Sequence, residues 1–250
     1  MGLYDRDYAK NPQTNNGLER INDRFNYDMG SSAESSHVIT DINAFVKTTY
    51  MYFAASLMAG TAGAYAGMQA AATIKSFYWP LVILEIALIF GLNFVRNKPG
   101  INVAVLFAFT FISGLTLTPL LSNILHMPGG AGIVTNAFLM TSVAFGGLTL
   151  FAMNTKKDFT MMGKMLFIAL IIMIVAGVVN IFLGSPILQL VLAGAGALLF
   201  SFFILYDTQN IINGAYDSPI SAAASLYLDF LNLFVSLLQI LGIFGGSKEE

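Results

Sequence analysis

The chain contains no cysteine and few charged residues. Asp, Glu, Lys and Arg together make up 10% of its 250 residues, against about 25% in an ordinary soluble domain. Without cysteine, neither disulfides nor thiolate metal sites can form. Only two histidines are present, His37 in a polar N-terminal stretch and His126 in an expected loop. Because no His-Glu-x-x-His pattern occurs either, zinc and serine-hydrolase chemistry are disfavoured.

Basic runs are also lacking, and no signal peptide is expected in the N-terminal stretch. The net charge is −2 and Lys and Arg do not cluster, so no nucleic-acid partner is expected. Residues 1–40 are polar and have no apolar core of the kind that a signal peptide needs. The abundant class is apolar, because 56% of the residues are hydrophobic. Low charge together with long apolar runs predicts an all-α, polytopic integral membrane protein.

The apolar runs divide the chain into three parts. The sequence predicts a polar, mostly disordered cytoplasmic tail over residues 1–43, a seven-helix transmembrane domain over 44–246 and a polar C-terminus over 247–250. Short links between the apolar segments predict antiparallel neighbours. The seven segments are about 48–68, 77–95, 101–125, 132–153, 161–183, 186–212 and 221–244. Pro119 is expected to kink the third, and Gly63 with Gly67 to permit close packing of the first.

Lysines and arginines in the links predict the orientation. They occur in the tail, after the second segment (Arg96 and Lys98) and after the fourth (Lys156 and Lys157), whereas the links on the other side carry only Lys75. Because cytoplasmic loops carry the excess of Lys and Arg, the N-terminus is predicted in the cytoplasm. Seven spans then place the C-terminus outside.

The last segment carries a polar stripe. Ser225, Asp229, Asn232, Ser236 and Gln239 recur at steps of four, three, four and three, which places them on one face of a helix. A carboxylate in hydrocarbon is costly unless it faces protein or water. We therefore expect this helix inside the bundle. The alternative is that the stripe only joins helices through hydrogen bonds, as Ser, Asn and Gln do in membranes.

Three carboxylates lie within the apolar segments: Glu85, Asp207 and Asp229. By helix rise alone, all three can meet in the cytoplasmic half of the bundle, and Arg96 can reach Asp207. Buried together, they must share protons, pair with Arg96 or bind a cation. Oxygen ligands without His or Cys suit a hard cation such as Ca²⁺, and a close aspartate pair would titrate as one unit. In the alternative, purely structural interpretation, Asp207 caps a solvated loop and Glu85 is protonated and packed among its neighbours.

Several motifs resemble the Bax inhibitor-1 family, also called the transmembrane Bax inhibitor motif family. The longest are Leu-Tyr-Asp-Thr-Gln-Asn-Ile at 205–211 and Ser-Leu-Tyr-Leu-Asp-Phe-Leu-Asn-Leu-Phe at 225–234. Residues 109–119 and 93–100 support them. The resemblance extends from about residue 45 to the C-terminus, and the short tail is similar to that of bacterial members, which suggests the inner membrane.

The resemblance implies a fold and a function. It implies seven helices with the last one surrounded by the other six, and a pH-sensitive calcium leak channel rather than an enzyme. Asp207 and Asp229 match the paired-aspartate proton sensor, Glu85 the pore-lining glutamate, and Arg96 the arginine that latches to the first aspartate. Calcium is then a permeant or transiently bound ion, no tightly bound cofactor is expected, and the partners are membrane lipid, Ca²⁺ and protons.

Two other functions compete with the leak. One alternative is a non-enzymatic regulator that binds other membrane proteins, for example a membrane-bound protease, and whose carboxylates are only structural. The other is an intramembrane aspartyl protease that uses Asp207 and Asp229 as its dyad. The second is disfavoured, because Leu-Tyr-Leu precedes Asp229 where such proteases have Gly-x-Gly, and Leu228 would crowd a scissile peptide.

Overall fold

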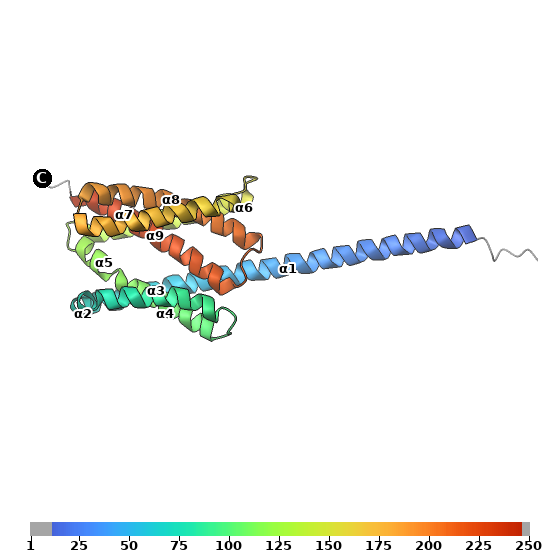
Figure 1. The fold of residues 1–250 in the computed structure, drawn as a ribbon, viewed down its shortest axis with the longest axis horizontal. Helices are drawn as coiled ribbons and strands as arrows, with labels where there is room; N and C mark the ends of the chain where they lie inside the picture. The colour runs from blue at the N-terminus through green and yellow to red at the C-terminus, as the bar shows by residue number, and fades with distance from the viewer. Residues whose placement is uncertain (1–11, 247–250) are drawn as a thin grey trace, which may run out of the picture. The chain divides into compact units, whose positions relative to one another are not determined.

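The structure, a computed structural model, describes the backbone of residues 12–246 and the side chains of residues 41–245. Within this range the regular structure is entirely helical (Figure 1), which confirms the predicted class. In chain order the helices are α1 (Pro12–Gln69), α2 (Ala71–Ser76), α3 (Tyr78–Val95), α4 (Ile101–Thr116), α5 (Thr118–Leu125), α6 (Gly130–Asn154), the 3-10 turn η1 (Thr160–Met162), α7 (Gly163–Leu183), α8 (Pro186–Ile212) and α9 (Pro219–Gly246).

Six of the segments in the described part of the chain are long and apolar enough to cross a membrane. They are α3, α4 with α5, α6, η1 with α7, α8 and α9. The first predicted segment, at 48–68, forms the last part of α1. It is rich in glycine, alanine and tyrosine, so it is less apolar than the others. The predicted seven segments thus all fall on helices.

The start of α1 differs from the expectation for the tail. Residues 12–43 belong to a helix, where composition predicts a mostly disordered segment. No proline lies between Pro12 and Pro80, so nothing in the covalent backbone imposes a break. The described residues up to Ala44 form a unit of their own, distinct from the unit that begins at Phe45. The predicted polar C-terminus, 247–250, lies outside the described residues.

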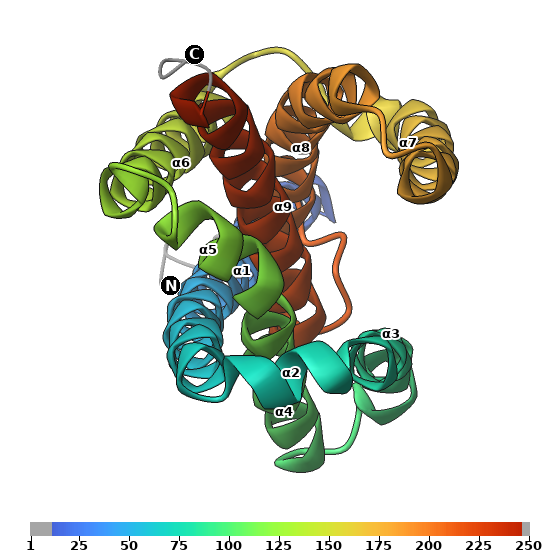
Figure 2. The ribbon, with the colours of Figure 1, turned by 90° about the vertical axis from the view of Figure 1, so that its left-hand side faces the viewer.

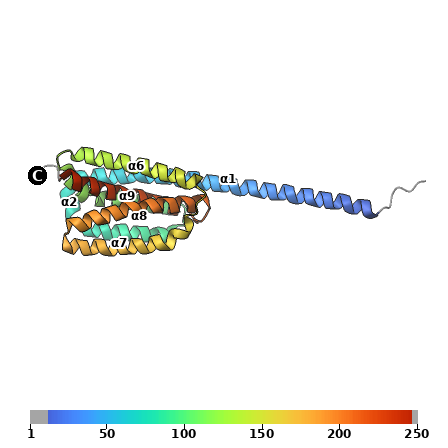
Figure 3. The same ribbon diagram turned by 90° about the horizontal axis from the view of Figure 1, so that it is seen from above.

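Helix α9 is the central element of the transmembrane domain (Figure 2). Half of the residues in its most apolar stretch are buried, compared with 6% in α3 and in α7. It packs against α8, α6 and α4, and its Tyr227 contacts Gly60 in α1. Helices α6 and α8 run alongside it, as the view from above also shows (Figure 3). The last helix is therefore central, as expected, while α3 and α7 pack mainly on α4 and α8 rather than on α9 itself.

Close approach of α1 to α4 depends on glycine. A Cβ atom on Gly63 would overlap the backbone oxygen of Phe111, and one on Gly114 would overlap the backbone oxygen of Gly60. The two helices touch backbone to backbone here, as small residues allow in membranes. Helix α4 ends at Thr116 and α5 begins at Thr118. The break occurs just before Pro119, whose ring disrupts the preceding helical turn, as the sequence predicts.

The connections 96–100, 155–162 and 213–218 lie at the same end of the domain, which we call the basic end because it carries Arg96, Lys98, Lys156 and Lys157. Gln209, near the end of α8, binds the backbone of the 155–162 connection. It donates a hydrogen bond to the carbonyl oxygen of Lys157 at 2.8 Å and accepts one from the backbone N–H of Phe159 at 2.6 Å. Because the buried side-chain amide of Gln209 both donates and accepts hydrogen bonds, it fixes the α6–α7 connection against α8.

Candidate functional site

Asp207 and Asp229 come together in the interior. Asp207 lies in the last turns of α8 and Asp229 in the basic-end half of α9, and each is about 95% buried, with exposed fractions of 5% and 4%. Their carboxyl groups lie within hydrogen-bonding reach of each other. Two buried carboxyl groups in contact need a proton or a cation between them, because two adjacent negative charges repel. The structure thus brings together the pair that the sequence singles out.

One oxygen of the pair has no partner. Asp229 Oδ2 is buried and accepts no hydrogen bond from any described residue. Leaving a buried carboxylate oxygen unsatisfied is costly, and each such atom calls for an explanation such as a proton, an ion or a water. The free oxygen marks the place where a ligand of the pair would bind.

Tyr216 closes the pair on the basic-end side. It follows α8 in the short α8–α9 connection, and its hydroxyl donates to Asp207 Oδ1 at 2.8 Å. It also lies within hydrogen-bonding reach of Ser225 in α9. Burial raises the pKa of Tyr216, and the charge of Asp207 adds to this effect, so the hydroxyl remains a donor at physiological pH. Sequence reasoning missed Tyr216, because a tyrosine in a polar link carries no periodic signal.

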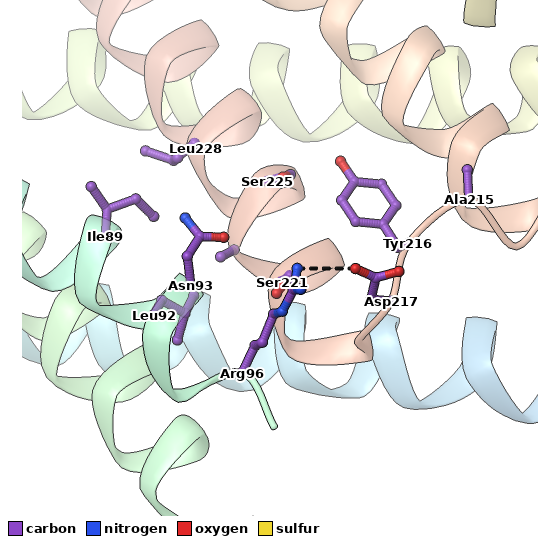
Figure 4. A pocket seen from close by; sticks show the side chains of 11 residues that line it. Ile89, Leu92, Asn93, Arg96, Ala215, Tyr216, Asp217, Ser221, Ser225 and Leu228 are labelled. Atoms are coloured by element: carbon purple, nitrogen blue, oxygen red, sulfur yellow. Dashed lines mark hydrogen bonds and ion pairs between the residues drawn. The ribbon is translucent and has the colours of Figure 1, made fainter. Parts of the chain in front are cut away.

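A cavity of about 320 Å³ opens beside Tyr216 at the basic end (Figure 4). Its wall includes Asn93 and Arg96 from α3, Tyr216 from the connection, and Ser221 and Ser225 from α9. We call it the basic-end cavity. Because Tyr216 lines the cavity and also binds Asp207, its ring separates the cavity from the aspartate pair.

Arg96 pairs with Asp217. Its Nη1 donates to Asp217 Oδ2 at 3.0 Å (Figure 4). The resemblance assigns Arg96 to Asp207, and the structure differs on this point. The physical reason is that Tyr216 already occupies Asp207, while the next residue, Asp217, faces the cavity mouth. The side chains of the ion pair are 45% and 71% exposed, so its contribution to stability is at most about 1 kcal/mol.

Glu85 lies apart from the two aspartates, contrary to the expectation that all three carboxylates meet. It accepts a hydrogen bond from Thr116 at 2.8 Å, because α3 packs along α4. Thr116 is one turn from Ser113, whose hydroxyl bonds the Tyr227 hydroxyl, and Tyr227 also donates to the carbonyl oxygen of Thr110. Glu85 thus belongs to a separate polar network on the Tyr227 side of α9.

The separation limits the metal chemistry of the site. Among the described side chains, no three His, Cys, Asp or Glu residues are placed to hold one metal ion. Asp207 and Asp229 alone offer carboxylate oxygens at one point, with the Tyr216 hydroxyl beside them. Two carboxylates suit transient binding of a hydrated hard cation, whereas tight calcium sites take six to eight oxygen ligands.

The comparisons with known proteins agree with the motifs. The family model described as "Inhibitor of apoptosis-promoting Bax1" matches residues 42–246. An uncharacterised protein of Campylobacter jejuni is 48% identical over 248 residues, which cover 98% of this chain and 99% of that protein. An uncharacterised membrane protein of Vibrio cholerae is 38% identical over 209 residues, with 81% and 91% covered.

A mammalian relative is similar over nearly the same length. Protein lifeguard 4 of Mus musculus is 33% identical over 228 residues, which cover 88% of this chain and 92% of that protein. The family model includes α8 and α9, which carry the aspartate pair. On this match and on its helical membrane fold, the chain belongs to the Bax inhibitor-1 family of membrane proteins.

Proposed function

We propose that the protein is a pH-sensitive calcium leak channel, with Asp207 and Asp229 as its proton sensor. The observation that carries the proposal is the buried contact between these carboxyl groups, one of which has an unpartnered oxygen. A proton bound between them neutralises the contact. Its loss leaves uncompensated negative charge in a low-dielectric interior, which is costly until a cation arrives. Protons and Ca²⁺ therefore compete for the same oxygens.

The surrounding groups shape this competition. Tyr216 supplies a neutral hydrogen-bond donor to Asp207, and Ser225 is the next polar group toward the basic end. The Arg96–Asp217 ion pair lies at the mouth of the basic-end cavity. We assign Arg96 the role of a latch on the α8–α9 connection that carries Tyr216. The resemblance assigns Glu85 to the pore, but its position beside Thr116 leads us to leave it out of the sensor.

The proposal includes an orientation and a setting. By the excess of Lys and Arg in its loops, the basic end faces the cytoplasm, with the N-terminus inside and the C-terminus outside. The bacterial relatives support a bacterial inner membrane. We assign no enzymatic activity, no tightly bound cofactor and no nucleic-acid partner. The ligands are Ca²⁺ and protons, and the surroundings are lipid.

A second candidate function is regulation of another membrane protein. It is favoured by the description of the matching family, which names inhibition of a protein that promotes apoptosis. In a bacterial membrane the corresponding partner would be another membrane protein, for example a protease. In that case the aspartate pair would only stabilise the bundle, and its replacement would leave the regulatory activity unchanged.

Reconstitution tests the two candidates. Purified protein in liposomes that enclose a calcium dye is expected to admit Ca²⁺ at a rate that changes between about pH 6 and about pH 8. Protein-free liposomes and liposomes with an unrelated helical membrane protein are the controls. Calcium entry no faster than in these controls at any pH contradicts the leak and moves the regulator to first place.

A further inference from the structure

A second polar cavity lies in the half of the bundle away from the basic end. Its volume is about 440 Å³, and its wall comes from α7, α8 and α9. Five of its lining residues carry carboxamide or hydroxyl groups and none is ionisable. They are Asn180, Gln189, Asn232, Ser236 and Gln239. We call this space the amide cavity.

The polar lining of the amide cavity favours water inside it when the helices span a membrane. Polar side chains at membrane depth need hydrogen-bond partners, and they face either protein or a wet cavity. Asn232 donates to the carbonyl oxygen of Leu228 at 2.7 Å, which leaves its own carbonyl oxygen as an acceptor. A volume of about 440 Å³ holds on the order of ten waters, at about 30 Å³ each. This exceeds the six to eight oxygen ligands of a hydrated Ca²⁺ ion.

The floor of the amide cavity lies next to the aspartate pair. Asn232 lines the cavity and stands one helical turn from Asp229 on the same face of α9. Phe200 also lines it and stands two turns from Asp207 on α8. Phe200 is 6% exposed and stacks on Phe203 with ring centres 5.9 Å apart. An aromatic side chain therefore lines the cavity at the α8 position nearest to Asp207.

The polar stripe of α9 connects the two cavities. Ser225 lines the basic-end cavity, Asp229 forms the pair, and Asn232 lines the amide cavity. One face of α9 thus carries polar groups from one cavity through the pair to the other. Glu85 has no part in this series, because it lies on the Tyr227 side of the helix.

We propose that the amide cavity is a hydrated vestibule that admits a hydrated cation to Asp229 from the side opposite the basic end, and that Phe200 closes its floor. The inference rests on the proposed leak and gives it a route, between α8 and α9 with α7 at the outer mouth. Neutral amide oxygens are ligands that Ca²⁺ accepts. Because they carry no charge, they hold the ion loosely enough for it to leave.

Cysteine labelling tests the hydration of the vestibule without any measurement of flux. The native chain has no cysteine, so any labelling of a single-cysteine variant occurs at the introduced thiol. We would compare Asn232→Cys with Leu198→Cys, which is a lipid-facing position on α8, 66% exposed. Measured from the helix ends opposite the basic end, position 232 lies ~21 Å along α9 and position 198 lies ~18 Å along α8, at about 1.5 Å per residue. The two thiols would therefore lie at similar depths. The probe is a membrane-impermeant trimethylammonium methanethiosulfonate, applied to protein in lipid nanodiscs.

The vestibule predicts labelling of Asn232→Cys and none of Leu198→Cys, because only a hydrated thiol ionises and reacts. Gln239→Cys, nearer the mouth, is expected to react at least as fast as Asn232→Cys. Equal reactivity at positions 232 and 198 overturns the hydrated vestibule, whatever the flux assay gives.

Flux measurements test the route. In the liposome assay of calcium entry, labelling of Gln239→Cys is expected to abolish entry. Phe200→Ala is expected to raise the rate of entry several-fold, and Glu85→Gln is expected to leave it unchanged. Loss of flux in Glu85→Gln with no effect of labelling at 239 overturns the route and places the path on the other side of α9. Absence of flux in the wild type overturns the proposed leak, and the route with it. In that case the labelling pattern still decides whether the vestibule is hydrated.

Discussion

Tyr227 and Asp229 point to opposite sides of α9. Side chains two residues apart on a helix point about 200° away from each other, at 3.6 residues per turn. Tyr227 accordingly contacts Ser113 in α4, whereas Asp229 contacts Asp207 in α8. The central helix therefore separates two polar networks. The Tyr227 network, with Glu85, fixes α3, α4 and α9 together, and the Asp229 network holds the titratable pair.

The close contact between α1 and α4 predicts a strong effect of one added methyl group. Gly63→Ala is expected to destabilise the protein by about 1–3 kcal/mol, because the new Cβ overlaps the backbone oxygen of Phe111. Gly91→Ala is the matched control, since nothing lies within 4 Å of its added Cβ. Thermal unfolding in detergent is the measurement. Equal melting temperatures for the two variants would show that the helices do not touch at Gly63.

The hydrogen bond from Tyr216 to Asp207 predicts a shift in pH dependence. Tyr216→Phe removes a donor that stabilises the ionised carboxylate. Without this donor, protons compete more easily with Ca²⁺ for the Asp207 carboxylate. The pH of half-maximal calcium flux is therefore expected to rise by roughly one unit, the equivalent of about 1.4 kcal/mol. Tyr65→Phe, at a position that is 70% exposed, is the control and should leave the midpoint unchanged. A midpoint that stays fixed in Tyr216→Phe argues against a role for this hydroxyl.

The ion pair between Arg96 and Asp217 predicts coupled effects on flux with little effect on stability. Arg96→Gln and Asp217→Asn each release the α8–α9 connection, so both are expected to raise flux to a similar extent. The double variant should do no more than either single one, because both remove the same contact. Melting temperatures should change little, since exposed ion pairs contribute at most about 1 kcal/mol. Additive effects on flux would mean that the two residues act separately.

The sequence predicts the helices well because each apolar segment is a local signal. Helix α8, Pro186–Ile212, has the predicted bounds, and the break before Pro119 follows from the chemistry of proline. The contact of Asp207 with Asp229 is also foreseeable, since the stripe on α9 must face protein. These features depend on residue type and helical spacing alone.

Other features depend on how helices rotate against one another, which spacing does not determine. Glu85 has nearly the depth of Asp229, yet α3 turns it toward Thr116. The partner of Arg96 is decided by the path of a short connection in which Tyr216 and Asp217 face different groups. The helical start of α1 is likewise not visible in composition, because polar residues are compatible with both a helix and a disordered tail.

The most direct test of the central claim is the pH dependence of calcium entry into liposomes for Asp207→Asn and Asp229→Asn. Asp158→Asn is the matched control, because Asp158 is an exposed carboxylate at the basic end whose hydrogen bonds are with Thr160. The account predicts that the wild type and Asp158→Asn show the same pH dependence of calcium entry. In Asp207→Asn and in Asp229→Asn this pH dependence is expected to be lost. An unchanged profile in Asp207→Asn and Asp229→Asn, with wild-type flux above that of empty liposomes, would contradict the assignment of these residues as the proton sensor.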